Sequence, residues 1–431
     1  MTKRRLNTLP INKRTRKLGK AAQAAGLLFM LAIAVCPALY ASTPTNGGGG
    51  VITIFPNKEA QYRIPAIVEC KSGKLVAFTD HRYQCDDIGG GRRLDIVMKT
   101  SKDGGKTWSA PEQTVAKGGS NTAADFNCAH GDAATVVDRE TGEILIMCAS
   151  GGIGFWESTR EQPIMVGRYC SRDEGKSWTG EEVTRDIYGL MPDVKGAFFT
   201  SGRICQSSRI KAGSHYRIYS ALATRAGNRV VYSDNFGKVW KILGENAAEA
   251  APKGDEAKIE ELPDGNVLLS SRVKNGRYFN IYRYSNRTAA SGIWSKAAFS
   301  SAENNGIAAN DNACNGEILL VRAKRKGKPA WLLLQSIPSG PQRTNVAIFY
   351  KELKTPDDYA SPEAIAKNWD GHYQVSHTTS AYSTMIQGRR GGIFFLYEEN
   401  AFRHPETETS DYYDIQMKKL SMKQITGNKY K

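Results

Sequence analysis

The chain has 431 residues, of which 40% are hydrophobic and 9% aromatic, as expected of a globular protein with a substantial core. Its formal net charge is +16, and residues 1–41 contribute +8 of that through eight Lys and Arg without any acid. The remaining +8 suits an acidic substrate or an anionic surface. No basic run with interleaved aromatics follows residue 41, so a nucleic-acid partner is not expected.

Cysteine and histidine argue against a disulfide scaffold and against a metal site. Seven Cys follow residue 41, an odd number without any Cys-x-x-Cys pair, and the six His are scattered along the chain. We therefore expect no metal and no organic cofactor.

Residues 1–41 have the pattern of a secretory signal peptide. A basic start precedes the apolar run Ala24 to Val35, and a small residue, Ala41, stands at a plausible cleavage point. The alternative is a retained membrane anchor, but the run is shorter than the roughly 20 residues of a spanning helix. We expect an exported protein (periplasmic, cell-surface or secreted), associated with a membrane only if this leader is retained. Residues 42–50 end in four Gly and are predicted to be a flexible linker.

A turn motif recurs along the rest of the chain. Ser101 to Trp108 reads Ser-Lys-Asp-Gly-Gly-Lys-Thr-Trp, Ser171 to Trp178 repeats it, Ser233 to Trp240 is a divergent copy, and Ser285 to Trp294 is a possible fourth trace. In this motif the Asp side chain accepts hydrogen bonds from backbone N–H groups ahead of it, and Gly supplies a positive φ. Recurrence at 50–70 residues indicates a repeated multi-stranded unit.

From Val51 onward the chain consists of short strand-like runs separated by turn residues, and residues 51–431 are predicted to form one domain. The best helical stretch is Ser361–Asn368, with Ser361 as N-cap and Pro362 in the first turn. Repeats of this size predict an all-β fold, a six-bladed β-propeller. A β-sandwich and a right-handed β-helix are the alternatives.

Near the start of this domain stands Tyr62-Arg-Ile-Pro65, upstream of the repeated turns. Together they make the chain resemble the sialidases (neuraminidases), whose signature is a Phe/Tyr-Arg-Ile-Pro sequence followed by several Asp boxes. The resemblance extends from about Val51 to about Leu420. It implies a six-bladed propeller whose Asp boxes lie on the outer rim, away from the chemistry, so Asp103 and Asp173 are expected to be structural.

The resemblance implies three arginines that bind the substrate carboxylate, because guanidinium groups bind carboxylates bidentately and stay charged. Arg63 matches the Arg of the signature, and Arg272, at the end of the strand Asn266 to Arg272, matches the second. Arg343 resembles the third, with Arg322 and Arg325 as nearby alternatives.

The resemblance also implies a tyrosine nucleophile, since a neutral phenol is not repelled by the substrate carboxylate as a carboxylate nucleophile would be. Tyr382, followed by Ser383, fits in order and context. A phenol needs a base, and Glu256, 16 residues before Arg272, is the predicted partner. Glu260 and Glu261 are the alternatives.

The acid/base is expected in the loop after the strand that follows Arg-Ile-Pro. Asp87 fits best, with Asp86 close behind, and the following Gly89 to Gly91 suggest a mobile loop. Arg82 is expected to contact the substrate, and Asp132 is a weaker candidate for the same role.

These residues imply a retaining exo-α-sialidase acting on sialylated glycoproteins, glycolipids or oligosaccharides. A transglycosylating enzyme of the trans-sialidase type would keep all of them. A non-catalytic sialic-acid-binding lectin would keep the arginines and lack Tyr382, Glu256 or the acid.

Overall fold

The protein is described by a computed structural model at residues 50–57, 61–83, 87–244, 249–400 and 413–431, all within the compact unit Asn46–Lys431. The predicted leader and the predicted linker, except Gly50, lie outside the described residues. Among the residues described, no helix has the length and apolar character needed to cross a membrane.

Six sheets, numbered here as blades in chain order, make up the fold. The first three blades are β2 (Gln61–Glu69), β3 (Leu75–Arg82), β4 (Leu94–Ser101) and β5 (Gln113–Ala116); β6 (His130–Val137), β7 (Ile144–Ser150), β8 (Met165–Ser171), β9 (Thr179–Glu182) and β11 (Gly202–Arg203); and β10 (Ala197–Phe199), β12 (Cys205–Ala212), β13 (His215–Thr224), β14 (Gly227–Ser233), β15 (Lys241–Ile242) and β16 (Ala251–Pro252). The last three are β17 (Ala257–Glu261), β18 (Val267–Val273), β19 (Gly276–Asn286), β20 (Ser291–Trp294) and β21 (Ala298–Ser300); β22 (Ile318–Arg325), β23 (Lys328–Gly340), β24 (Thr344–Leu353) and β25 (Gly371–Gln374); and β26 (Ser380–Gln387), β27 (Ile393–Glu399), β28 (Asp414–Leu420) and β1 (Ile52–Phe55).

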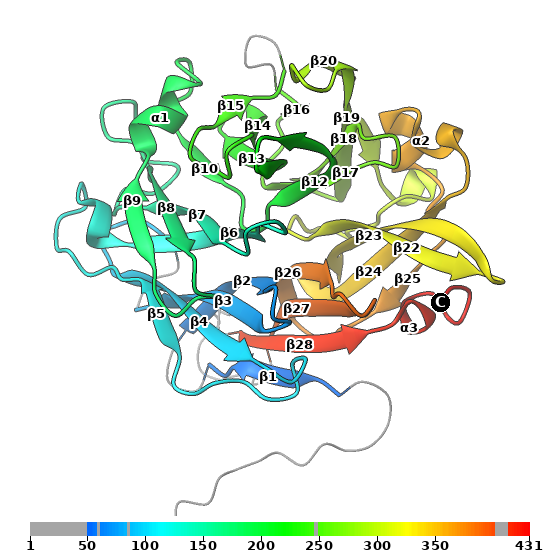
Figure 1. Cartoon of the computed structure of the whole chain (residues 1–431), viewed down its shortest axis with the longest axis horizontal. Coiled ribbons are helices and arrows are strands. Elements are labelled where there is room, and N and C mark those ends of the chain that lie inside the picture. Colours follow the sequence, from blue (N-terminus) through cyan, green and yellow to red (C-terminus); the bar gives the residue numbers. More distant parts are fainter. Residues whose placement is uncertain (1–49, 58–60, 84–86, 245–248, 401–412) are drawn as a thin grey trace, which may run out of the picture. The chain divides into compact units, whose positions relative to one another are not determined.

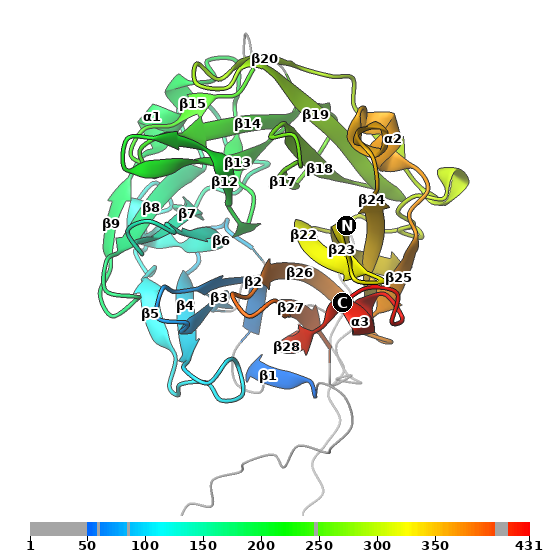
Figure 2. The same ribbon diagram turned by 45° about the vertical axis from the view of Figure 1, so that its right-hand side comes forward.

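The blades form a closed ring (Figures 1 and 2), with β2, β6, β12, β17, β22 and β26 towards its centre and the short β11 on the inner side of β6. The first strand, β1, pairs antiparallel with β28, so the earliest strand completes the last blade and closes the ring. Closure leaves each sheet covered by its neighbours. The predicted six-bladed propeller is confirmed, and the sandwich and β-helix alternatives are excluded.

The repeated turns are built as the motif predicts. Oδ1 of Asp173 accepts hydrogen bonds from the N–H groups of Lys176 and Ser177, both at 2.9 Å, and Asp103 does the same in the first copy. In the third copy Asn235 replaces the Asp and accepts from Val239 at 2.8 Å. The fourth trace, 285–294, forms the β19–β20 hairpin.

The Trp side chains of these turns pack beside adjoining blades. The ring of Trp178, in the second blade, meets Phe78 of the first blade edge to face, with centroids 5.8 Å apart. Trp108 packs on the apolar cluster between the first and last blades, which includes Phe394 and Met417. Each such Trp therefore joins two sheets that are separate in hydrogen bonding.

Helices are short in the described residues: α1 (Thr184–Gly189), α2 (Pro362–Ala366), α3 (Met422–Ile425) and the 3-10 turns Phe126–Cys128, Ala302–Asn304 and Pro356–Tyr359. Ser361 caps α2 as predicted by accepting a hydrogen bond from the Ala364 N–H. The predicted end at Asn368 is wrong, because Lys367 already has an extended backbone (φ −107°, ψ 162°).

The strand that carries the Arg-Ile-Pro sequence starts earlier than the pattern suggests. The apolar run Ala66–Cys70 predicts a strand after the Arg-Ile-Pro sequence, whereas β2 spans Gln61–Glu69. Between Arg63 and Ala66 the pairing with β3 shifts register, and Ile64 has a φ of 60°. A bulge next to Pro65 therefore follows Arg63, which itself still pairs with Asp80 of β3 in the ladder.

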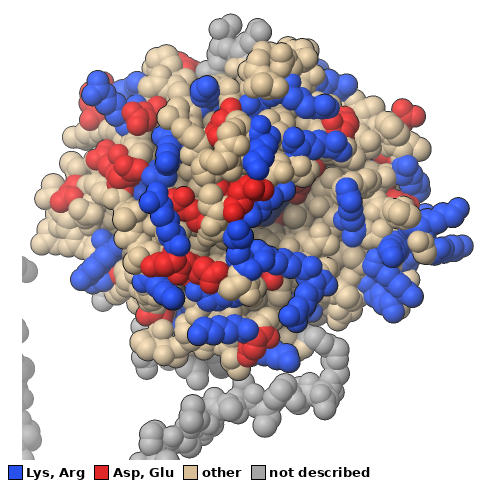
Figure 3. All heavy atoms as spheres, in the orientation of Figure 1, with Lys and Arg blue, Asp and Glu red and all other residues tan. Residues whose placement is uncertain are grey.

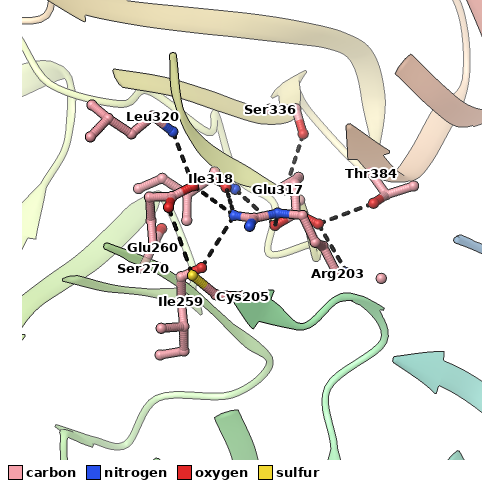
Figure 4. Close-up of polar contacts among 12 residues, drawn as sticks. Arg203, Cys205, Ile259, Glu260, Ser270, Glu317, Ile318, Leu320, Ser336 and Thr384 are labelled. Carbon is pink, nitrogen blue, oxygen red and sulfur yellow. Dashed lines mark hydrogen bonds and ion pairs between the residues drawn. The ribbon is translucent and has the colours of Figure 1, made fainter. Parts of the chain in front are cut away.

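Buried charges fill the middle of the ring (Figure 4). Nη2 of Arg203 donates to Oε2 of Glu260 at 2.7 Å and to the Ile318 carbonyl at 2.8 Å, while Glu317 accepts from Thr384 Oγ1 at 3.0 Å. These residues come from four different blades. They form a polar plug, defined here as Arg203, Glu260, Glu317 and Thr384, that ties the inner strands together.

Candidate active site

One cavity of about 780 Å³ collects every residue predicted for the site. In several blades the cavity lies at the start of the inner strand (β2, β17, β26) and at the end of the strand that follows it (β3, β18). These two positions meet at one end of an antiparallel blade. Its polar lining includes Arg63, Arg82, Asp87, Asp132, Asp255, Glu256, Arg272, Arg343 and Tyr382.

Tyr382 and Glu256 form the centre of the cavity. The Tyr382 hydroxyl donates to Oε2 of Glu256 at 2.7 Å, and Nη1 of Arg272 donates to the same oxygen at 2.5 Å. Nη1 of Arg272 also donates to the Tyr382 hydroxyl at 3.1 Å. The three groups form a closed triangle in which the phenol proton points at a carboxylate.

The pKa of Tyr382 lies well above its ordinary value because the group is buried and because Glu256 is negatively charged. The charges of Arg272 and Arg343 act in the opposite direction and favour the phenolate. At rest the hydroxyl therefore keeps its proton.

The arginines Arg63, Arg272 and Arg343 converge on the Tyr382 ring. The guanidinium carbons of Arg63 and Arg343 each lie 5.6 Å from its centroid, and Arg272 contacts its hydroxyl. Arg343 sits in the turn between β23 and β24 with a φ of 59°. Three cations around one small volume make a site for a carboxylate or a similar anion.

Glu398, which the sequence patterns did not single out, holds two of these residues in place. Its Oε1 accepts from Nε of Arg63 at 2.8 Å and from the Ile64 N–H at 2.7 Å, and its Oε2 accepts from the Tyr382 N–H at 3.0 Å. The only sequence signal was a carboxylate in the apolar strand β27, a position that requires a buried partner.

At the opposite side of the cavity Arg82 lies between two carboxylates. Nη2 of Arg82 is 3.2 Å from Oδ2 of Asp80 and 3.6 Å from Oδ1 of Asp87. The Asp87 side chain is 74% exposed, so a ligand in the cavity can reach it. The neighbouring Asp86 lies outside the described residues.

Asp80 and Asp132 form a second carboxyl pair that the sequence did not predict as a pair. Asp80 accepts from the Asp132 N–H at 3.1 Å, and Asp132 has a φ of 58°. Burial raises the pKa of Asp80 to about 7, against the opposing charge of Arg82. Burial and the charges of Asp80 and Asp87 raise the pKa of Asp132 as well. Of the two, Asp132 lines the cavity, whereas Asp80 lies behind it, paired with Arg82.

The residues that the sequence left as alternatives to Arg343 and Glu256 lie elsewhere in the fold. Arg325 pairs with Glu352 at 2.8 Å and Arg322 stacks on Trp331, so neither lines the cavity. Glu260 belongs to the polar plug, and Glu261 accepts from Ser207 and Ser208. Geometry separates these residues from Arg343 and Glu256 where spacing alone could not.

An apolar wall that sequence reasoning missed completes the cavity: Ile88, Phe155, Trp156, Ile164 and Phe198. Trp156 is 73% exposed and meets Phe155 edge to face at 4.9 Å. An exposed Trp at a cavity mouth offers a flat apolar surface for a ligand. In the described part of the chain, no group of three or more His, Cys, Asp or Glu is arranged to hold a metal ion.

Comparison with known proteins places this chain in a family. Residues 93–395 match the family described as "BNR repeat-like domain". The chain belongs to that family. It is 34% identical over 233 residues to a sialidase of Micromonospora viridifaciens, which covers 51% of this chain and 33% of the relative, and 23% identical over 367 residues to a sialidase of Paraclostridium sordellii, which covers 82% and 85%.

The chain thus spans about a third of the length of the Micromonospora relative. Among solved structures, the leech intramolecular trans-sialidase superimposes with a TM-score of 0.67 at 17% identity, covering 89% of this chain and 71% of that one. The Hadza microbial sialidase Hz136 gives 0.64 at 20% identity, covering 85% and 66%. At such identities these BNR-family likenesses establish the shared propeller fold.

Proposed function

We propose that this protein is a retaining exo-α-sialidase that removes terminal sialic acids from glycoproteins, glycolipids or oligosaccharides. The observation that carries the proposal is the 2.7 Å hydrogen bond from Tyr382 to Glu256 beneath three converging arginines. This combination suits a substrate with a carboxylate on its anomeric carbon, as the sialidase names of the relatives suggest.

In the proposed reaction Arg63, Arg272 and Arg343 bind the carboxylate and fix the anomeric carbon over Tyr382. The phenol oxygen forms a bond to that carbon while its proton passes to Glu256, and the glycosidic C–O bond breaks. The arrangement supports this step because a proton acceptor already lies on the phenol, and Arg272 stabilises the negative charge that develops.

Asp87 is the proposed acid/base. It donates a proton to the departing glycosidic oxygen and then removes one from the water that hydrolyses the tyrosyl intermediate, with retention at the anomeric carbon. Its exposure within the cavity and its ion-pair distance to Arg82 support this role. Asp86 is the alternative.

Release of 4-methylumbelliferone from its α-sialoside tests the proposal in the wild type, Tyr382→Phe and Asp87→Ala. Turnover by the wild type and its loss in Tyr382→Phe support the assignment. An Asp87→Ala variant as active as the wild type on sialyllactose, whose leaving group needs a proton, would transfer the acid role to Asp86. Saturable binding of sialic acid without turnover would make the protein a lectin instead.

Transfer of the sialyl group to an acceptor other than water is the second candidate, favoured by the exposed Trp156 at the cavity mouth. Analysis of products made in the presence of an added sugar acceptor separates the two: free sialic acid alone indicates hydrolysis, and a new sialoside indicates transfer.

We also propose that the protein is exported, on the basis of the leader-like residues 1–41. Detection of the protein, and of the residue at its mature N-terminus, in fractionated cells of its source organism tests this proposal.

A further inference from the structure

Two further hollows, which adjoin each other, lie at the other end of the blades from the active-site cavity. One, of about 500 Å³, is lined by residues that include Gln206, Arg209, Glu261, Arg322, Trp331 and Gln387. Glu256 and Glu261 stand five residues apart near the two ends of β17, a separation of about 17 Å in an extended strand. The polar plug lies between these ends, so this hollow is separate from the catalytic cavity.

The second hollow, of about 580 Å³, adjoins the first, because Arg322 and Gln387 line both. Its charged side chains are all basic: Arg322, Arg390, Lys419, Lys423 and Lys431. Figure 3 shows Lys and Arg side chains gathered over the nearby β22–β23 hairpin and α3, at the right of the view. We call the two hollows together the basic groove.

Arg322 lines both hollows of this groove, and its side chain is fixed by a neighbouring ring. It stands directly across from Trp331 in the β22–β23 pair, with its guanidinium carbon 4.8 Å from the Trp centroid. Trp331 also packs against the core beneath, so the indole supports the guanidinium from one side. A guanidinium stacked in this way presents its N–H edge as a fork for a planar anion.

Two carboxylates, Glu260 and Glu261, line the first hollow, but the cationic side chains of the two hollows outnumber them. Both oxygens of Glu261 accept hydrogen bonds from Ser207 and Ser208, and Glu260 is paired with Arg203. Among the described residues no ion pair is formed by Arg322, Arg390, Lys419 or Lys423. The cationic side chains therefore remain open to an incoming anion.

We propose that the basic groove is a second binding site, distinct from the catalytic cavity, for an acidic oligosaccharide that carries carboxylate or sulfate groups. Its concave shape suits a chain of sugar rings, with Gln387 at the junction of the two hollows as a neutral hydrogen-bonding group. Trp331 lines the groove, but Arg322 covers its ring, so it offers no free face on which a base could stack, as single-stranded nucleic acid requires.

Binding of labelled oligosaccharides without sialic acid tests the site independently of the active-site chemistry. The probes are a carboxylated galacturonate oligomer and a sulfated heparin oligomer, followed by fluorescence anisotropy, with a neutral malto-oligosaccharide for comparison. Binding of either acidic probe, weakened by added salt, is expected, and the preferred probe identifies the anion. Binding of neither acidic probe, or equal binding of the neutral one, overturns the proposal.

Arg322→Gln is expected to weaken binding of the acidic probe at least tenfold. Arg185→Gln is the matched control: it removes the same charge from an exposed position on α1, outside the groove, and is expected to leave the affinity unchanged. Turnover of 4-methylumbelliferyl sialoside is expected to be the same in both variants. Equal losses in the two variants, or equally tight binding of oligo-dT or of phosphatidylglycerol vesicles, would contradict a glycan site in the groove.

Discussion

Glu398 and Arg63 form a buried ion pair, with Oε1 of Glu398 2.8 Å from Nε of Arg63 and side-chain exposures of 0% and 4%. The pair fixes the arginine that opens the Arg-Ile-Pro sequence, and the second carboxylate oxygen fixes the backbone of Tyr382. A residue without access to the substrate thus positions two residues that line the cavity.

Glu398→Gln is expected to raise the KM for the α-sialoside roughly tenfold to a hundredfold, with a smaller change in kcat. The carboxylate of Glu398 accepts hydrogen bonds from Arg63, Ile64 and Tyr382. The amide of a glutamine would turn an N–H donor toward one of these three N–H groups, so that Arg63 loses its orientation. Removing one partner of a buried pair also costs about 3 kcal/mol of stability. Glu399→Gln, one residue on, is the matched control. A fall in stability with KM unchanged would make Glu398 merely structural.

Asp87→Asn is expected to lower kcat/KM about 10²- to 10⁴-fold on a natural sialoside, whose leaving group needs a proton. The loss on an aryl sialoside is expected to be smaller, because a phenol leaves without protonation. Parallel measurements on sialyllactose and the 4-methylumbelliferyl substrate check this, with Asp86→Asn alongside. Equal losses on both substrates would argue against an acid role for Asp87.

Trp156→Ala is expected to raise the KM for a sialylated oligosaccharide about tenfold while leaving the KM for a small aryl sialoside almost unchanged. The physical reason is that its 73% exposed side chain lies at the cavity mouth, where a sugar beyond the cleaved bond would stack. Trp156→Phe, which keeps an aromatic ring, should retain most of the affinity. A similar rise for both substrates would place Trp156 in contact with the sialic acid itself.

Asp173→Ala is expected to lower Tm at neutral pH without changing KM. Hydrogen bonds from Ser177 and its neighbours hold the pKa of Asp173 below its ordinary value in the folded protein. A carboxylate of this kind stabilises the fold above its unfolded pKa of about 3.9, and the contribution is lost as the pH falls through the folded value.

The Tm difference between wild type and Asp173→Ala should therefore shrink as the pH falls below about 4. Asp173→Asn should lose less than the Ala variant, because Asn235 already fills this role in the third copy of the turn. Thermal melts across this pH range provide the measurement, and a raised KM at unchanged Tm would contradict a structural role.

Arg203→Met is expected to destabilise the protein by about 3–5 kcal/mol in urea unfolding, because it leaves Glu260 buried without its cation and leaves Glu317 with Lys258 alone. Arg203→Met combined with Glu260→Gln should recover part of that loss, because one uncompensated charge is gone. Additive losses in the double variant would mean that the two side chains stabilise the ring independently.

Much of the fold followed from local signals. The Ser-x-Asp-x-Gly-x-Thr-Trp turn depends on hydrogen bonds within a few residues, so its recurrence could be read before any contact between blades was known. The end of α2 could not, since Lys367 is extended although neither Lys367 nor Asn368 is a residue that breaks a helix. The early start of β2 was also missed, because its bulge at Ile64 breaks the alternation on which strand prediction depends.

The site divides in the same way. Motif and order along the chain pointed to Arg63, Glu256, Arg272 and Tyr382, and the structure brings them into one cavity. Spacing left Arg343 competing with Arg322, and only the fold showed them at opposite ends of one blade.

The sequence by itself determined the kind of fold and the types of residue that its site would need, because turn chemistry and motif order are local properties. The tertiary structure alone decided which residues support them. Glu398 meets Arg63 across 335 positions of sequence, and Trp331 supports Arg322 at the end of the ring away from Tyr382. The contact of Glu398 with Arg63 exists only when the ring closes, since closure brings β27 of the last blade beside β2 of the first.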